Sequence, residues 1–410
     1  MQEPSPPLDQ PNTNWLAIFI LFLAGLVAAI QFSKMSPIMQ AVGHDLSLGL
    51  VASGFSVSLL GIVGVLFAIT MGAIVTAIGL KRGLLIALFG GGIIALLGAL
   101  APNGPLFLFS RFCEGFSHLL IVVCTPALMA AHAKPKDKPI ALAIWGCFFG
   151  LGFAIASTAA PYIVPWAGWR PFLMCHGVAM LLVGVAASFV LARSSYADTK
   201  SNAPTLSSII STHGTVFQTT TSILLALTFC AYTILFLAVL TFLTVFLQSA
   251  MAWPLSSIGP FMALCSFVSL AFTLAAGFLI RAGLSLFAGF AAAFLGVAVT
   301  AIGIFVGQPE TIALVPLMLV MMACFGLLPG FAFSSVPEVA PTPVLAALTY
   351  SAIALFGNVG TFLGTPIFAA SYNAAGWLGG AMFVVTMSAA GICLATLLNH
   401  NLRKKDYFDA

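Results

Sequence analysis

The stretch from Phe107 to Leu120, FLFSRFCEGFSHLL, places three ionisable side chains in an otherwise apolar run. Arg111, Glu114 and His118 are spaced by three and four residues, so on a helix they lie on one stripe and either neighbour can contact Glu114. An ionisable group near the centre of a bilayer costs at least about 2.5–3.5 kcal/mol, and it is retained where it faces a cavity or finds a partner. The stripe therefore predicts either a binding and proton-transfer site or an Arg–Glu pair that fixes helix packing.

The composition indicates that this stripe lies in a membrane. The chain has 410 residues, of which 61% are hydrophobic and only 6% are charged, whereas a soluble domain contains about 25% charged residues. The net charge of +4 is dispersed along the chain and does not indicate nucleic-acid binding. The eight cysteines fall in apolar runs without a C-x-x-C pair, so we expect no disulfide, metal site or other cofactor. We predict an all-α polytopic membrane protein.

The breaks between apolar runs divide the chain into two sets of six spans. A span requires about 20 apolar residues, and proline, glycine and charged clusters mark its ends. The polar stretch 193–220 predicts a cytoplasmic linker between an N-terminal bundle, 14–192, and a C-terminal bundle, 221–399. We expect cytoplasmic tails at 1–13, which we predict to be disordered, and at 400–410. The predicted spans are 14–34, 50–75, 83–101, 105–131, 140–164, 171–192, 221–247, 256–280, 284–306, 311–336, 345–370 and 376–399.

The basic residues predict the orientation of these spans. With a cytoplasmic N-terminus, Arg170 is the one basic residue of the outer loops, and this asymmetry follows the positive-inside rule. An even number of spans places the basic C-terminal stretch NHNLRKKD on the same side as the inner loops. We predict cytoplasmic termini and a plasma membrane location, such as the inner membrane of a bacterium. The basic residues of the inner side are Lys81, Arg82, Lys134, Lys136, Lys138, Arg193, Lys200, Arg281, Arg403, Lys404 and Lys405.

Glycine patterns recur at equivalent places in the two halves. The turn after the second span reads GAIVTAIGLKR (72–82), and the turn after the eighth reads GFLIRAG (277–283). The fifth and eleventh spans contain GCFFGLG (146–152) and GNVGTFLG (357–364). Small residues at such spacing let helices approach closely, in static packing or across a moving interface. The residues that we assign to packing or conformational change are Gly72, Gly79, Lys81, Arg82, Gly115, Gly146, Gly150, Gly152, Asn358 and Gly360.

Four motifs, taken together with the twelve spans and the linker, resemble the major facilitator superfamily. The 72–82 turn resembles its G-x-x-x-D-R-x-G-R-[KR] signature, and Arg111-x-x-x-Gly115 resembles its R-x-x-x-G signature in span 4. The sequence AGWRP at 167–171 is similar to the family's turn between spans 5 and 6, and the 357–364 stretch is similar to many span 11 sequences. The overall pattern most resembles the branch that contains cyanate and nitroimidazole transporters.

Two departures from the family pattern affect the interpretation. The family's Asp-Arg pair is Thr76-Ala77 here, so the usual cytoplasmic charged latch cannot form from those positions. Lys81 and Arg82 remain in this turn, where they either take part in conformational change or only set the orientation of the chain in the membrane. The Gly-Pro pair of the family's drug antiporters is Gly150-Leu151 here, which weakens an assignment as a drug exporter.

The resemblance also implies where a substrate cavity lies. Major facilitator proteins form two six-helix bundles around a central cavity, which spans 1, 4, 7 and 10 line. For span 7 this implies cavity positions for Tyr232, Thr233 and Thr241, and for span 10 it implies Ser334 and Ser335. Apolar helices give few clues to their facing, so these positions follow from the resemblance alone.

The remaining intramembrane charges predict the chemistry of the substrate. Lys34 ends span 1 one turn beyond Gln31, and it either extends to the outer headgroups or turns inward. If Lys34 turns inward, it and Arg111 form two cations against one carboxylate, which favours an anionic substrate that Arg111 could grip bidentately. Glu114 is then the best candidate for the proton-coupling group, with His118 second.

The sequence favours a secondary active transporter of a small organic solute, anionic and proton-coupled, in which two bundles rock around a central site. A proton-driven efflux antiporter for drugs or metabolites and a facilitative uniporter remain alternatives. An integral-membrane enzyme is disfavoured because the sequence shows no catalytic constellation, and His176 in span 6 is assigned a structural role. The expected partners are the solute, protons and lipid, without nucleic acid, and the expected state is a monomer.

Overall fold

A computed structural model describes residues 12–192, 219–308, 310–340 and 343–409. Every regular element in these ranges is a helix, which confirms the predicted all-α class. The first half contains α1 (Trp15–Ser33), η1 (Ser36–Ile38), α2 (Met39–Asp45), α3 (Leu50–Ile78), α4 (Leu80–Ala99), α5 (Gly104–Ala131), α6 (Lys138–Gly146), α7 (Phe148–Ala167) and α8 (Trp169–Ala192). The second half contains α10 (Thr220–Ser249), α11 (Leu255–Arg281), α12 (Leu286–Ala301), η2 (Ile302–Val306), α13 (Thr311–Ser334), α14 (Val336–Val339) and α15 (Pro343–Asp409).

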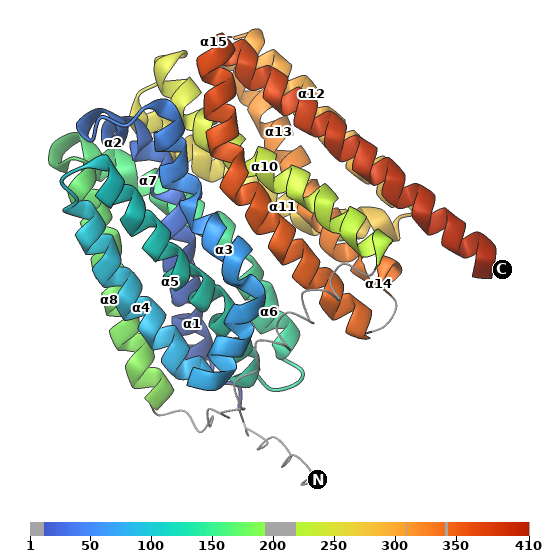
Figure 1. Cartoon of the computed structure of the whole chain (residues 1–410), viewed down its shortest axis with the longest axis horizontal. Helices are drawn as coiled ribbons and strands as arrows, with labels where there is room; N and C mark the ends of the chain where they lie inside the picture. The colour runs from blue at the N-terminus through green and yellow to red at the C-terminus, as the bar shows by residue number, and fades with distance from the viewer. Residues whose placement is uncertain (1–11, 193–218, 309, 341–342, 410) are drawn as a thin grey trace.

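The long helices match the apolar runs of the sequence. Within the described residues, 11 helical segments are long and apolar enough to cross a membrane. The last of them, Ala352–Arg403, belongs to α15, whose backbone is not helical at Ala375 and Gly376. The predicted spans 345–370 and 376–399 are therefore the two arms of α15, which fold back at this turn (Figure 1).

The helices form two bundles, which Figure 1 shows as the blue-to-green and the yellow-to-red halves of the molecule. In the first, α4 packs on α5 and α8, and α1 packs on α5, α7 and α8. In the second, α10 and α12 pack on α15, and α13 packs on α11 and α12. The bundles meet where α3 contacts α15 and α7 contacts α11. The predicted linker at 193–220 lies almost entirely outside the described residues.

Equivalent turns of the two halves share a glycine with a positive φ. Gly79, between α3 and α4, and Gly283, between α11 and α12, both have a φ of 94°, a conformation that side chains with a Cβ disfavour. Gly168 ends α7 with a φ of 83°, and Gly376 divides the arms of α15 with a φ of 58°. Both of these turns read Ala-Gly-Trp, at 167–169 and at 375–377. The repeat that the 72–82 and 277–283 stretches predicted therefore extends to a second pair of turns.

Close helix contacts occur at several of the predicted glycines. A Cβ on Gly115 would lie 2.7 Å from Val63 on α3, and a Cβ on Gly152 would lie 2.4 Å from Ala29 on α1. These distances are shorter than van der Waals contact, so a larger residue would push the helices apart. Gly72 and Gly146 lie within α3 and α6, respectively.

The two bundles are joined at the end of the molecule where α1 ends. Ser36 Oγ donates a hydrogen bond of 3.2 Å to Thr244 Oγ1 on α10. Thr365 Oγ1, on the first arm of α15, donates a hydrogen bond of 2.8 Å to the carbonyl oxygen of Gly54 on α3. We call this end, defined by these four residues, the joined end.

Candidate functional site

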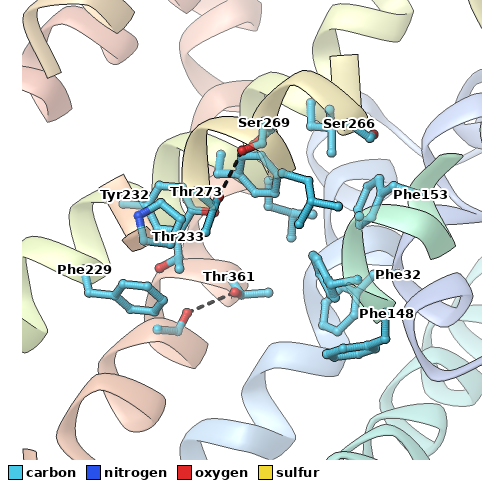
Figure 2. A pocket seen from close by; sticks show the side chains of 18 of the residues that line it. Phe32, Phe148, Phe153, Phe229, Tyr232, Thr233, Ser266, Ser269, Thr273 and Thr361 are labelled. Carbon is cyan, nitrogen blue, oxygen red and sulfur yellow. Dashed lines mark hydrogen bonds between the residues drawn. The ribbon is translucent and has the colours of Figure 1, made fainter. Parts of the chain in front are cut away.

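A cavity of about 540 Å³ lies between the bundles. Figure 2 shows Phe32, Phe148 and Phe153 from the first bundle across the space from Phe229 and Tyr232 of the second. Aromatic rings offer large apolar faces that stack with or edge onto a planar ring. The arrangement therefore fits a small organic molecule with an apolar, preferably aromatic, body.

Polar groups on the cavity wall are mostly hydroxyls. Thr273 on α11 donates its hydroxyl hydrogen either to the carbonyl oxygen of Ser269, at 3.0 Å (Figure 2), or to that of Gly326, at 2.9 Å. Among the described residues that line the cavity there is no Asp, Glu, Lys or Arg. The polar lining residues are His118, Tyr232, Thr233, Ser266, Ser269, Thr273, Asn358 and Thr361.

A cluster of charged side chains lies inside the first bundle. Lys34 Nζ donates hydrogen bonds to both carboxylate oxygens of Glu114, at 2.9 and 2.8 Å, and lies 3.1 Å from His176 Nδ1. The other ring nitrogen of His176 lies 2.9 Å from the carbonyl oxygen of Val27. Since a carbonyl only accepts, His176 carries its hydrogen on Nε2, and Nδ1 is left to accept from Lys34.

Arg111 completes this cluster and ties three helices together. Its Nη1 donates to Glu114 one turn further along α5. Its Nε donates to the carbonyl oxygen of Ser56 on α3, at 2.8 Å, and its Nη2 donates to that of Gln31 on α1. Each nitrogen of the guanidinium thus donates one hydrogen bond to a protein acceptor, and these bonds hold α5 against α1 and α3. We call Lys34, Arg111, Glu114 and His176 the charge cluster.

The charge cluster is buried and carries an excess positive charge. Lys34 and Arg111 are 0% exposed and Glu114 is 2% exposed. With Lys34 and Arg111 protonated, the single carboxylate of Glu114 balances one of two cations. In a medium of low dielectric constant, an unbalanced charge acts over a longer range than in water.

The charge cluster lies directly behind one wall of the cavity. Phe32, which lines the cavity, precedes Lys34 by two residues on α1. His118, which also lines the cavity, is one helical turn beyond Glu114 on α5. The excess positive charge therefore affects a solute in the cavity through its electrostatic field and not through direct contact.

The structure places the predicted site residues in two groups. His118, Tyr232 and Thr233 line the cavity, together with Gly150 and Asn358 from the packing set. Arg111, predicted to bind the substrate, is buried and does not line the cavity; each of its three guanidinium nitrogens donates one hydrogen bond to the protein, to Ser56, Glu114 and Gln31. The residues expected at the site that do not line the described cavity are Lys34, Arg111, Glu114, Gln31, Thr241, Ser334 and Ser335.

Each residue outside the cavity has a visible environment. Lys34 turns inward and does not extend to the headgroups, which is one of the two alternatives that the sequence left open. Gln31 is buried and its Nε2 donates to Ser117 Oγ at 3.3 Å. Thr241 is buried within α10, whereas Ser334 is exposed, and Ser335, directly after α13, donates to the carbonyl oxygen of Ala332 on that helix.

The predicted packing residues outside the cavity contact neighbouring helices. A Cβ on Gly360 would lie 2.6 Å from the carbonyl oxygen of Cys230, so the first arm of α15 lies close against α10. Lys81 Nζ donates to the carbonyl oxygen of Leu191 at 3.0 Å, which links the start of α4 to the end of α8. Arg82 is exposed, in keeping with an orientation charge.

Two parts of the site were missing from the sequence prediction. His176 belongs to the charge cluster, and its isolation in an apolar span was the one available signal. The hydroxyls of α11, Ser266, Ser269 and Thr273, form a run at helical spacing that indicates one polar stripe on span 8.

A helical membrane protein with two bundles and a cavity between them has the architecture of a solute transporter. The family model for the Major Facilitator Superfamily matches residues 21–365. The chain belongs to this superfamily of membrane transport proteins.

Among curated proteins, the gallate transporter of Pseudomonas putida is 25% identical over 187 residues, which are 42% of this chain and 41% of the relative. The 4-hydroxybenzoate transporter PcaK of Pseudomonas aeruginosa is 24% identical over 182 residues, 44% of this chain and 40% of the relative. The matches thus span about two fifths of the length of these relatives. A crystal structure of the nucleoside transporter NupG has a TM-score of 0.77 at 14% identity, covering 93% of this chain and 99% of that chain, which shows the shared fold.

Proposed function

We propose that the protein is a secondary active transporter whose solute is a small aromatic acid held in the cavity between the bundles. The observation that carries this proposal is the aromatic lining contributed by both bundles. Two relatives named as transporters of gallate and 4-hydroxybenzoate support the same class of solute. The predicted relation to cyanate and nitroimidazole transporters stays a prediction, and an aromatic acid suits this lining better than cyanate does.

The charge cluster supports an anionic solute. A carboxylate in the cavity faces no carboxylate on the described wall and feels the excess positive charge behind Phe32 and His118. Charge of one sign around a cavity with low-dielectric walls concentrates ions of the opposite sign there. The anion is therefore attracted without a direct salt bridge, which also leaves it free to dissociate.

Glu114 is the proposed proton-coupling residue. Protonation of its carboxyl group would remove the counter-charge of Lys34 and Arg111 and increase the attraction for an anion in the cavity. Glutamine carries no charge, as the protonated carboxyl group does, so we expect Glu114→Gln to uncouple or abolish proton-driven transport while solute binding survives. Full transport driven by a pH gradient in this variant would reject the assignment.

Transport is proposed to follow a rocker-switch exchange of access, in which the bundles separate at the joined end and close at the other. The positive-inside rule assigns the joined end to the outer side and both termini to the cytoplasm of a bacterial inner membrane. The single chain supplies both walls of the cavity, so a monomer is sufficient. Efflux by proton antiport and facilitated diffusion are the alternatives within this class.

The test is a thermal-shift measurement on the purified protein in detergent, with benzoate, 4-hydroxybenzoate, gallate, D-xylose and uridine as candidate solutes. A ligand that binds the folded state at 100 times its Kd stabilises it by about 2.7 kcal/mol, so we expect the aromatic acids to raise the melting temperature. The matched variants are Phe149→Ala, on the cavity wall, and Phe109→Ala, which is 63% exposed.

Loss of one aromatic contact should weaken binding by roughly 2- to 10-fold in Phe149→Ala and leave it unchanged in Phe109→Ala. Stabilisation by xylose or uridine without any effect of the three acids would contradict the proposal.

A further inference from the structure

His118 presents one unused hydrogen-bonding atom at the cavity. It lies on α5, is partly exposed and belongs to the lining residues. Its Nδ1 lies 3.0 Å from the carbonyl oxygen of Ala28 on α1. Within the described part of the chain, its Nε2 makes no hydrogen bond and is not among the buried polar atoms that lack a partner. Nε2 is therefore the part of the ring that a bound molecule can reach.

The contact with Ala28 fixes what this atom can do. A carbonyl oxygen only accepts hydrogen bonds, so Nδ1 carries the hydrogen. In the neutral ring Nε2 then has a lone pair and acts as an acceptor. The neighbouring charge cluster already holds an excess positive charge on Lys34 and Arg111, which opposes a further positive charge on His118.

The ring of His118 is also held in place. The Phe32 ring lies 4.8 Å away between centroids, at an interplanar angle of 84°. This edge-to-face contact and the bond to Ala28 together restrict the imidazole, so its orientation is set before a solute arrives. A fixed acceptor beside an aromatic wall selects for a molecule that has a hydrogen-bond donor on or near its own ring.

We infer that His118 Nε2 accepts a hydrogen bond from a ring hydroxyl of the transported solute, and that this contact makes the transporter selective for phenolic acids. The inference rests on the proposed function and names the chemical feature that the cavity distinguishes. A carboxylate is a poor partner for Nε2 because both groups would be acceptors. The hydroxyl therefore points to His118, and the carboxylate occupies another part of the cavity.

The test compares two acids of equal charge and similar shape, 4-hydroxybenzoate and 4-methylbenzoate. Their dissociation constants are measured by isothermal titration calorimetry on wild-type protein and on His118→Gln and His118→Phe. The glutamine amide can donate to Ala28 and still offer an oxygen to the cavity, whereas phenylalanine keeps a ring without an acceptor. Melting temperatures of the unliganded variants establish that both are folded.

We expect wild-type protein to bind 4-hydroxybenzoate about 10-fold more tightly than 4-methylbenzoate, as one net hydrogen bond of good geometry provides. The preference should persist in His118→Gln and disappear in His118→Phe. Equal binding of the two acids by wild-type protein, or an unchanged preference in a folded His118→Phe variant, would overturn the inference and leave the proposed function standing. Binding of neither acid by wild-type protein would overturn both.

Discussion

Replacing Glu114 by glutamine removes the single negative charge of the charge cluster. Its two oxygens accept hydrogen bonds from Lys34, at 2.9 and 2.8 Å, and from Arg111. The glutamine side chain has the same shape, but its NH₂ group faces donors and its charge is zero. Breaking a buried ion pair by removing one partner costs about 3–5 kcal/mol. We expect Glu114→Gln to lose that much free energy of unfolding.

Replacing Lys34 by methionine has a different expected cost. The Arg111–Glu114 pair remains and is electrically balanced. Glu114 loses the donor Lys34, and His176 Nδ1 loses its partner, but the desolvation of a buried ammonium, which costs several kcal/mol, is also removed. We expect the two effects to offset each other to within about 2 kcal/mol.

The double variant Lys34→Met/Glu114→Gln separates charge from packing. One unpaired cation should be less costly than two, so the second substitution should recover part of the stability that Glu114→Gln loses. The assay is unfolding of the purified protein in mixed detergent micelles by added SDS, analysed as a double-mutant cycle. A double variant that is less stable than Glu114→Gln would refute the charge balance described for this cluster.

Three further predictions follow from single contacts. Arg111→Lys should destabilise the protein by about 1.5–3 kcal/mol or more, measured in the same unfolding assay, because an ammonium cannot replace the separate bonds to Ser56 and Gln31. Ser36 and Thr244, whose hydroxyl oxygens are 3.2 Å apart, can both be replaced by cysteine. Oxidation of this double variant to a disulfide should stop solute uptake by proteoliposomes, and reduction should restore it. Uptake that persists in the cross-linked protein would contradict opening at the joined end. Thr365→Val should favour that opening by about 1 kcal/mol, and accessibility of a cysteine label there measures the change.

The sequence predicted those features that depend on local spacing or on the length of an apolar run. Arg111 and Glu114 meet because residues three apart on a helix are neighbours. The break predicted between the spans 345–370 and 376–399 falls beside the turn at Ala375 and Gly376, because the apolar run before it is long enough for a span.

The sequence could not predict which side of an apolar helix lines the cavity. Thr233 and Thr241 lie on the same helix, yet the first lines the cavity and the second is fully buried outside it. Helices that are apolar on all sides carry no stripe to distinguish a cavity from a packed interface. For the same reason, the pairing of Lys34 with Glu114 and His176 became visible only when three helices were placed together.

Uptake of radiolabelled 4-hydroxybenzoate by proteoliposomes, with an imposed pH gradient that is acid outside, tests the central claim most directly. The account predicts accumulation above the external concentration, loss of that accumulation on addition of a protonophore, and slower uptake at limiting solute concentration by Phe149→Ala than by Phe109→Ala. Uptake no greater than in protein-free liposomes, or identical uptake by the two variants, would contradict it.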